Sequence, residues 1–379
     1  MPGGLRLLAL LGVGLALGAC AAPAGPDAVS VTPVREPRQG LAYYWQSVTG
    51  HLSLLRAARP LDDWLADSVA PAALKDRLAQ AQRMRRFAVT ELHLPDNASY
   101  TRYADLGRRA AVWNVVATPE FSLQLQTWCF VVVGCVGYRG YFDEAEAQAF
   151  ADGLRAQGLD AVVYPVPAYS TLGWMNWLGG DPLLSTFVGY PEGELARLLF
   201  HELAHQVVYV ADDTVFNESF ATAVERLGGE RWLAQATPGA RTEYARFDAR
   251  RRAFRALALE VRQSLKEIYA PALSDTGVSA PENETRLRAA KQAVLADFRQ
   301  RYAGLKAGWE GYGGYDAWVA RANNASFAVQ AAYDEQVPAF MALFEREGRD
   351  FARFYDAVRR LGALPAAQRQ AELALLMSR

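Results

Sequence analysis

The stretch Phe200-His201-Glu202-Leu203-Ala204-His205-Gln206 decides the fold, because it places an H-E-x-x-H pattern inside the helix predicted over Pro191–Val210. In a helix, residues four apart lie one turn apart on the same face, so the imidazoles of His201 and His205 can reach one point. Two such imidazoles can bind one Zn²⁺ at about 2.0–2.1 Å. Glu202 lies about 100° further round the helix, too far to join the same coordination shell. We predict that Glu202 acts instead as general base for the water bound to the metal.

A third metal ligand is expected from the next helix. The run Asn217-Glu218-Ser219-Phe220-Ala221 opens this second helix, which is predicted to end at Gly228-Gly229. A catalytic zinc needs three protein ligands and one open position, and Glu218 is placed to complete the set. Taken alone, a first-turn glutamate is explained equally well by the helix dipole, and two histidines four apart by a buried helix. Because the chain has only four histidines, the combined pattern favours one Zn²⁺ bound by His201, His205 and Glu218.

The first 38 residues are predicted to export and anchor the chain. Residues 1–19 contain the apolar run Leu7–Leu17, which is too short to span a bilayer core of about 30 Å and is typical of a signal peptide. Leu17-Gly18-Ala19-Cys20 resembles a bacterial lipobox, in which Cys20 is lipidated after cleavage, while an ordinary signal peptide cut nearby is the alternative. Residues 20–38 hold four prolines and are predicted to form a flexible tether.

Export leads to two further predictions. Ala21, rather than an aspartate, follows Cys20, which favours the outer membrane, so we expect a lipid-anchored bacterial cell-envelope protein facing the periplasm. In an oxidising compartment, Cys129 and Cys135 can close a small loop as a disulfide, with buried free thiols as the alternative. Their spacing fits no zinc-knuckle pattern, because no second Cys or His pair accompanies them.

Composition narrows the class of protein. The chain of 379 residues has 40 Lys and Arg against 41 Asp and Glu, a net charge of −1, and 51% hydrophobic residues. Such a chain can bury a large core, which excludes a disordered tail or a small disulfide scaffold. Nucleic acid is not expected as a ligand, because phosphate binding needs a concentrated excess of Lys and Arg. We predict a single unit over residues 39–379, with a core at 39–230 and a helical part at 231–379.

Hydrophobic periodicity predicts mostly helices and a few strands. Two β-branched, aromatic segments, Ala110–Ala117 and Ala161–Val166, are typical of strands. The long charged segments Arg241–Tyr269 and Pro281–Leu305 are expected to form an antiparallel helical hairpin. Other helices are predicted over Leu41–Leu55, Ala72–Leu92 and Phe142–Gln157. The expected fold class is therefore α+β and predominantly α-helical.

Several motifs together resemble one known family. The pair His201-Glu202-x-x-His205 and Asn217-Glu218-Ser219-Phe220-Ala221 is similar to the H-E-x-x-H and N-E-x-x-A elements of gluzincin metallopeptidases, in which that Glu is the third zinc ligand. More specifically, the chain resembles the bacterial lipoprotein aminopeptidase family. Other stretches that carry this resemblance are Tyr43-Tyr44-Trp45-Gln46, Leu94-Pro95-Asp96-Asn97-x-Ser99-Tyr100, Tyr138-Arg139-Gly140-Tyr141-Phe142, Tyr169-Ser170-Thr171-Leu172-Gly173-Trp174, Asp181-Pro182-Leu183-Leu184-Ser185 and Asn323-Asn324-Ala325.

The resemblance implies a zincin-like core with a small sheet packed on the zinc helix, followed by a helical C-terminal part. It also implies a hydrolase, a metalloprotease acting as an aminopeptidase on peptide substrates. The chain departs from better-known gluzincins in two ways: only twelve residues separate His205 from Glu218, and no G-x-M-E-N amine-binding motif precedes the zinc helix. An envelope endopeptidase and a non-catalytic zinc-containing binding lipoprotein therefore stay open as alternatives.

Further roles are predicted for residues outside the zinc motif. Zincins place a substrate-pairing edge strand about thirty residues before the zinc helix, and in this chain that position holds Tyr169, Ser170 and Thr171. Tyr333 is the predicted oxyanion donor, with Tyr315 and Tyr169 as rivals. Other supporting residues are predicted as well: Asn217 as an orienting or capping residue, and Thr222 and Glu225 as hydrogen-bond partners of a ligating histidine.

Overall fold

Helices dominate the computed structural model, which describes residues 40–130, 134–171, 176, 179–270, 280–332 and 335–377. The predicted α+β, mainly helical class is confirmed. The helices of the described chain are α1 Gly40–Ala57, α2 Leu61–Ala66, α3 Ala72–Thr90, α4 Glu144–Arg155, α5 Glu192–Ala204, α6 Thr214–Ala234, α7 Pro238–Tyr269, α8 Ala280–Ala307, α9 Asp316–Arg321, α10 Asn324–Ala332, α11 Val337–Arg346, α12 Phe351–Gly362 and α13 Ala366–Met377.

The chain consists of two compact units, Met1–Tyr43 and Tyr44–Arg379, and the second holds nearly all of the described residues. The predicted signal peptide (1–19), the lipobox cysteine Cys20 and the tether (20–38) lie outside the described residues. Within the described residues, no helix is both long enough and apolar enough to cross a bilayer.

Three small sheets accompany the helices. The strands are β1 Arg59–Pro60, β2 Arg102–Ala104, β3 Val112–Pro119, β4 Trp128–Phe130, β5 Gly134–Val136, β6 Arg139–Tyr141, β7 Leu159–Val166 and β8 Leu183–Leu184. The largest sheet has the order β6-β3-β7 and is antiparallel throughout; a second sheet has the order β1-β2-β8, and β4 pairs with β5 as a hairpin. The two strands predicted from sequence are thus direct neighbours, with Val116 opposite Val162.

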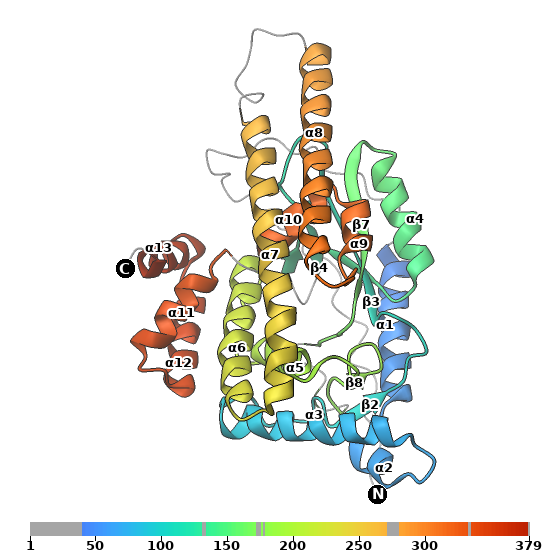
Figure 1. Cartoon of the computed structure of the whole chain (residues 1–379), viewed down its shortest axis with the longest axis vertical. Coiled ribbons are helices and arrows are strands. Elements are labelled where there is room, and N and C mark those ends of the chain that lie inside the picture. The colour runs from blue at the N-terminus through green and yellow to red at the C-terminus, as the bar shows by residue number, and fades with distance from the viewer. Residues whose placement is uncertain are drawn as a thin grey trace, which may run out of the picture. The chain divides into compact units, whose positions relative to one another are not determined.

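The central sheet is covered on both faces. Seven consecutive residues of β3, from Val112 to Thr118, are buried, which is typical of a strand enclosed on both sides. Val116 and Val162 form one apolar cluster with Ala325 of α10, while Ala147 and Phe150 are buried on α4. Figure 1 shows α4 and α10 on opposite sides of this sheet.

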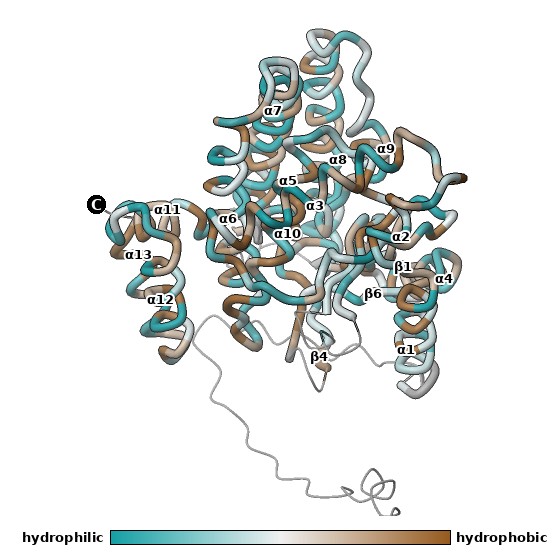
Figure 2. The backbone as a smooth tube through the Cα atoms, turned by 90° about the horizontal axis from the view of Figure 1, so that it is seen from below, coloured by the Kyte–Doolittle hydropathy of each residue, from teal (hydrophilic) through white to brown (hydrophobic). Residues whose placement is uncertain are grey.

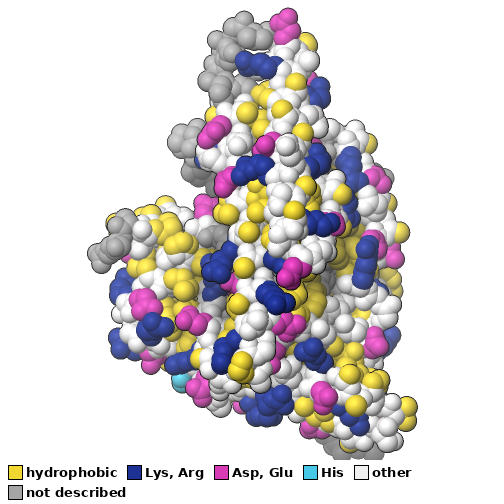
Figure 3. Space-filling view, in the orientation of Figure 1, with side chains coloured by type: hydrophobic (Ala, Val, Ile, Leu, Met, Phe, Trp, Pro, Cys, Tyr) yellow, Lys and Arg dark blue, Asp and Glu magenta, His cyan; other side chains and the backbone are white. Residues whose placement is uncertain are grey.

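The predicted helical hairpin is formed by α7 and α8, which run side by side in Figure 1. Phe254 of α7 and Phe298 of α8 belong to a shared apolar core that also receives Phe327 of α10. Outward-facing charges of both signs are interspersed over the face shown in Figure 3. The hairpin is therefore an amphipathic pair packed on the rest of the chain through its apolar side.

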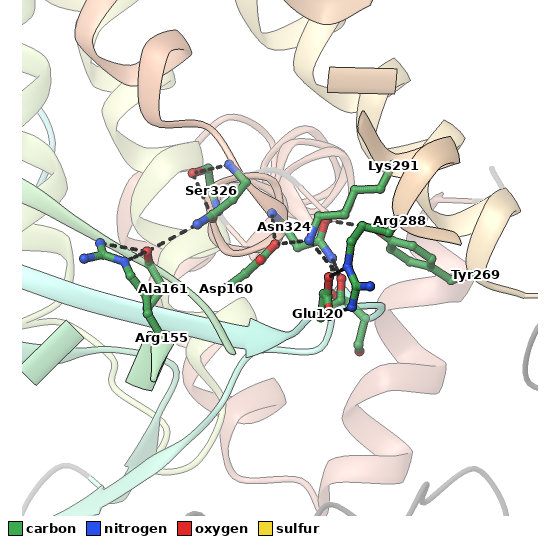
Figure 4. A network of polar contacts seen from close by, with 11 residues as sticks. Glu120, Arg155, Asp160, Ala161, Tyr269, Arg288, Lys291, Asn324 and Ser326 are labelled. Carbon is green, nitrogen blue, oxygen red and sulfur yellow. Dashed lines mark hydrogen bonds and ion pairs between the residues drawn. The ribbon is translucent and has the colours of Figure 1, made fainter. Parts of the chain in front are cut away.

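A buried polar network fastens α8 to the sheet (Figure 4). Lys291 of α8 is 4% exposed and donates to Asp160 of β7 at 2.6 Å and to the Glu120 carbonyl at 3.0 Å. The backbone N–H of Asn324 also donates to Asp160, and the Asn324 side chain donates to the Glu120 carbonyl at 2.8 Å. One carboxylate thus joins the starts of β7 and α10 to the middle of α8.

The C-terminal helices pack on α6 through aromatic side chains of α11 and α12. Phe340 of α11 contacts both Phe216 and Phe220 of α6, at ring-centroid distances of 5.2 and 5.8 Å. Hydrophobic and hydrophilic segments alternate along α12 and α13 in Figure 2, as expected for amphipathic helices. This layer backs the helix that carries Glu218.

Two predicted helix ends are wrong. Helix α6 does not end at Gly228-Gly229 but continues to Ala234. A Cβ atom at Gly228 would lie 2.6 Å from Leu92 and 2.9 Å from Phe200, so the glycine permits close packing of α6 against its neighbours. The predicted zinc helix is also shorter than expected, because α5 ends at Ala204 and the chain then turns toward α6.

Candidate metal centre

Two adjacent helices bring the three predicted ligands together. Nε2 of His201 lies 3.2 Å from Nε2 of His205, and Oε2 of Glu218 lies 3.3 and 3.7 Å from these two nitrogens. His201 belongs to α5, His205 caps its C-terminal end, and Glu218 lies in the second turn of α6. All three donor atoms lie within 4.8 Å of one another and could hold a metal ion.

The donor set fits zinc. Tetrahedral ligands at about 2.0–2.1 Å from Zn²⁺ are themselves about 3.3–3.4 Å apart, which is close to the three separations observed. Two imidazoles and one carboxylate are ordinary zinc ligands of a catalytic site. His201 and His205 are 8% and 7% exposed, so the polar atoms converge in a largely enclosed space.

Burial shifts the protonation of this centre. It lowers the pKa of His205 to about 4, so this imidazole is neutral near pH 7, as a metal ligand must be. Burial also raises the pKa of Glu202 to about 7, and the charges of Glu218 and Asp181 add to the rise, while His201 opposes it. A carboxyl with such a pKa can take up and release a proton near neutral pH.

Two tyrosines lie near Glu202. Burial raises the pKa of Tyr100 well above its usual value, and the charge of Glu202 adds to the rise. The pKa of Tyr138 is raised by burial and by the charges of Glu218 and Glu202. Tyr100 is 1% exposed and holds a left-handed backbone with φ of 63°. The sequence alone assigned no role to either tyrosine.

A buried ion-pair network stands behind His201. Of the two α6 residues predicted to support a histidine, Glu225 lies 3.0 Å from Nδ1 of His201, while Thr222 is buried one turn earlier. The other Glu225 oxygen accepts a hydrogen bond from Arg197 of α5, which is 5% exposed. This contact holds the imidazole in an orientation that points Nε2 at the other two donors.

The network continues into α7. Glu194 and Asp248 each lie 3.9 Å from Nη1 of Arg197, and Arg251 pairs with both carboxylates, at 2.6 and 2.5 Å. Sequence periodicity gives no sign of this arrangement, because α7 is distant in sequence from α5 and its charges follow an ordinary solvated pattern. Helix α7 thereby contributes to the setting of the metal centre.

The short connection between α5 and α6 is secured by side chains. Asn217 accepts from the Val210 N–H at 2.8 Å and donates to the Val210 carbonyl at 2.7 Å. Asp213 is the N-cap of α6, and its carboxylate accepts from the Phe216 N–H at 3.0 Å. Asn217 therefore orients the connection, whereas the N-cap of α6 is Asp213. Asp212 takes the left-handed conformation that a turn of this length requires, with φ of 64°.

The hairpin β4–β5 lies against this connection. Cys129 and Cys135 are opposite each other in the hairpin and are joined by a disulfide. The Cys135 N–H donates to Asp212 at 2.6 Å. Tyr138 follows the hairpin directly, so the crosslinked loop and the turn after α5 together bring this tyrosine near Glu218.

The described part of the expected substrate-pairing strand does not have strand geometry. Tyr169, Ser170 and Thr171 follow the end of β7 in irregular backbone. The reason is a buried carboxylate: Asp181, 1% exposed, accepts from the Thr171 N–H at 3.0 Å and from the hydroxyls of Thr171 and Ser170. Tyr169 contacts the rings of His51 and Phe142. A role for these three residues in substrate binding stays a prediction.

Of the predicted oxyanion donor Tyr333 and its two rivals, Tyr169 lies beside the rings of His51 and Phe142. Tyr333 lies outside the described residues. Tyr315 is stacked on Phe254 at a ring-centroid distance of 4.0 Å within the core of the helical hairpin, so it serves packing.

One supporting loop was missed by reasoning from sequence. Asn97 donates to the Gln206 side chain at 2.7 Å, and Gln206 donates to Ser99 at 3.1 Å. The loop from Leu94 to Tyr100 is thereby fastened to the residue that follows His205. The only sign of this loop in the sequence is its motif, which is one of the stretches that carry the family resemblance.

Comparison with known proteins supports the expected family. Neither a curated protein nor a solved structure matches the chain. A family model described as "Putative aminopeptidase" matches residues 42–373, which is most of the chain. The chain therefore belongs to this aminopeptidase family.

Proposed function

We propose that the protein is a zinc-dependent aminopeptidase that removes N-terminal residues from peptides in the bacterial cell envelope. One observation carries the proposal: donor atoms of His201, His205 and Glu218 converge to within 4.8 Å, beside the buried Glu202. Membership of an aminopeptidase family supports peptide bonds as the substrate class. Cys20 would carry the lipid anchor at the outer membrane, which the lipobox-like Leu17-Gly18-Ala19-Cys20 supports.

Zn²⁺ held by His201, His205 and Glu218 would polarise the scissile carbonyl and make a water molecule more acidic. Glu202, next to His201 on α5, accepts the proton of the attacking water and passes it to the leaving amine. Its buried setting keeps the carboxyl able to do both near neutral pH. Glu225 and Arg197 support the site through His201, by fixing the orientation of its ring.

The test uses the chain from Cys20 onward carrying Cys20→Ser, with zinc quantified by mass spectrometry. One peptide library is supplied with free N-termini and, separately, with acetylated N-termini. We expect loss of the first residue from free-amine peptides only, and we expect Glu202→Gln to abolish cleavage while zinc stays bound. Glu230→Gln, an exposed change on α6, is the matched control and should cleave like wild type.

Each outcome assigns the function differently. Internal cleavage of acetylated peptides would identify an endopeptidase and overturn the exopeptidase assignment. Stoichiometric zinc without any cleavage would support a binding lipoprotein instead. Full activity of Glu202→Gln would refute the role of Glu202.

A further inference from the structure

Helix α1 exposes an unusual apolar stripe. Of the nine large apolar side chains that are exposed within the described residues, four lie on α1: Tyr44, Trp45, Val48 and Leu52, at 46%, 71%, 53% and 37% exposure. At about 100° per residue, these four positions fall within an arc of about 100°. Contiguous exposed apolar side chains of this kind mark an interaction surface.

The opposite face of α1 fixes the orientation of the stripe. Gly50 lies so close to Phe142 that an added Cβ would be 2.1 Å from its ring, and Leu54 is 1% exposed. The Gln46 side chain accepts from the Phe142 N–H at 3.1 Å and donates to the Gly140 carbonyl. Because the inner face is held by these contacts, the stripe is directed away from Gly140 and Phe142.

The charge carried by α1 itself suits an anionic surface. No Asp or Glu occurs between Glu36 and Asp62. Arg56 is exposed near the end of α1, and on the helical wheel it lies about 40° from Leu52. Trp and Tyr prefer the boundary between lipid chains and headgroups, and an adjacent Arg is attracted to anionic lipid.

We infer that the α1 stripe, defined by Tyr44, Trp45, Val48 and Leu52, docks on the surface of an anionic lipid bilayer. The inference rests on the proposed lipid anchor for its choice of partner. Cys20 is 20 residues before Gly40, where α1 begins, and a tether of that length, if flexible as predicted, would span about 22–27 Å on average. A lipid on Cys20 would therefore hold this stripe close to a bilayer, where a second, weaker contact is effective.

The test measures binding without the lipid, so that only the stripe can act. The Cys20→Ser chain from residue 20 onward is sedimented with vesicles of phosphatidylethanolamine and phosphatidylglycerol. We expect the chain with the wild-type stripe to bind the vesicles. The double variant Trp45→Ser, Val48→Ser should partition onto them at least about tenfold more weakly. Val69→Ser removes a side chain that is 87% exposed outside the stripe and should bind within about twofold of wild type.

A second readout separates this inference from the proposed enzyme activity. Peptide cleavage in solution should be the same in the double variant and in wild type, which also shows that the variant is folded. Equal vesicle binding by the double variant, or no binding by the wild-type stripe, would overturn the inference. Dimers that dissociate in the double variant would also overturn it and assign the stripe to a second copy of the chain.

Discussion

Replacing Glu225 with glutamine is expected to weaken zinc binding by about 10- to 100-fold. Glu225 accepts at both oxygens, from Arg197 on one side and from Nδ1 of His201 on the other. A glutamine has only one accepting oxygen, so its NH₂ group must face either the guanidinium or the imidazole N–H, both of which are donors. Whichever way the amide turns, one of the two contacts is lost.

The substitution has two separate costs, one in zinc affinity and one in the free energy of unfolding. A tenfold to hundredfold change in zinc affinity corresponds to about 1.4–2.8 kcal/mol of binding free energy, which is lost because the His201 imidazole is no longer held in its orientation. Arg197 also keeps its charge while 5% exposed, and unpairing a buried charge costs about 3–5 kcal/mol. Because Glu194 and Asp248 still lie 3.9 Å from the guanidinium, we expect the lower end of that range.

The assay is competition for zinc with a chromophoric chelator at a temperature where both proteins are folded, with thermal unfolding of the metal-free chains measured in parallel. Glu230→Gln on the same helix makes the same chemical change at an exposed position and should leave both values unchanged. Unaltered zinc affinity in Glu225→Gln would refute the orienting role of this carboxylate.

Three further changes test the packing that supports the site. Gly228→Ala should cost about 1–3 kcal/mol of unfolding free energy by overpacking, measured with urea; a neutral effect would show that α6 can shift freely. Lys291→Met removes a buried cation from the half-buried Asp160 carboxylate and should cost up to about 3 kcal/mol, whereas Lys306→Met at an exposed pair should cost less than about 1 kcal/mol; equal costs in denaturant titrations would contradict the burial argument. Reduction of Cys129–Cys135 should lower stability by about 2 kcal/mol, and an unchanged urea midpoint would exclude any constraint by the disulfide.

Local patterns predicted the parts of the site that lie within two adjacent helices. The spacing of His201 and His205 and the position of Glu218 follow from helix geometry, so sequence reasoning could place all three donors. Strands β3 and β7 were predictable because each carries a run of β-branched and aromatic residues bounded by turn residues. In contrast, strands of two or three residues, such as β8, carry too few side chains to show a pattern.

Long-range packing accounts for what sequence reasoning missed. Two adjacent glycines, Gly228 and Gly229, are typical of a helix end, but their role in this chain is to admit neighbouring side chains at close range. The pairing of Arg197 with Glu225 joins two helices, and Thr171 leaves strand geometry because Asp181 binds it. Each of these depends on a partner that is far away in the sequence or invisible to periodicity.

The proposed function depends on one zinc ion held by His201, His205 and Glu218. The most direct measurement is anomalous diffraction at the zinc absorption edge from crystals of the chain. We predict a single peak about 2.0–2.1 Å from Nε2 of His201, Nε2 of His205 and a carboxylate oxygen of Glu218. A peak bound by other residues, or zinc-loaded crystals without a peak at this position, would contradict this assignment.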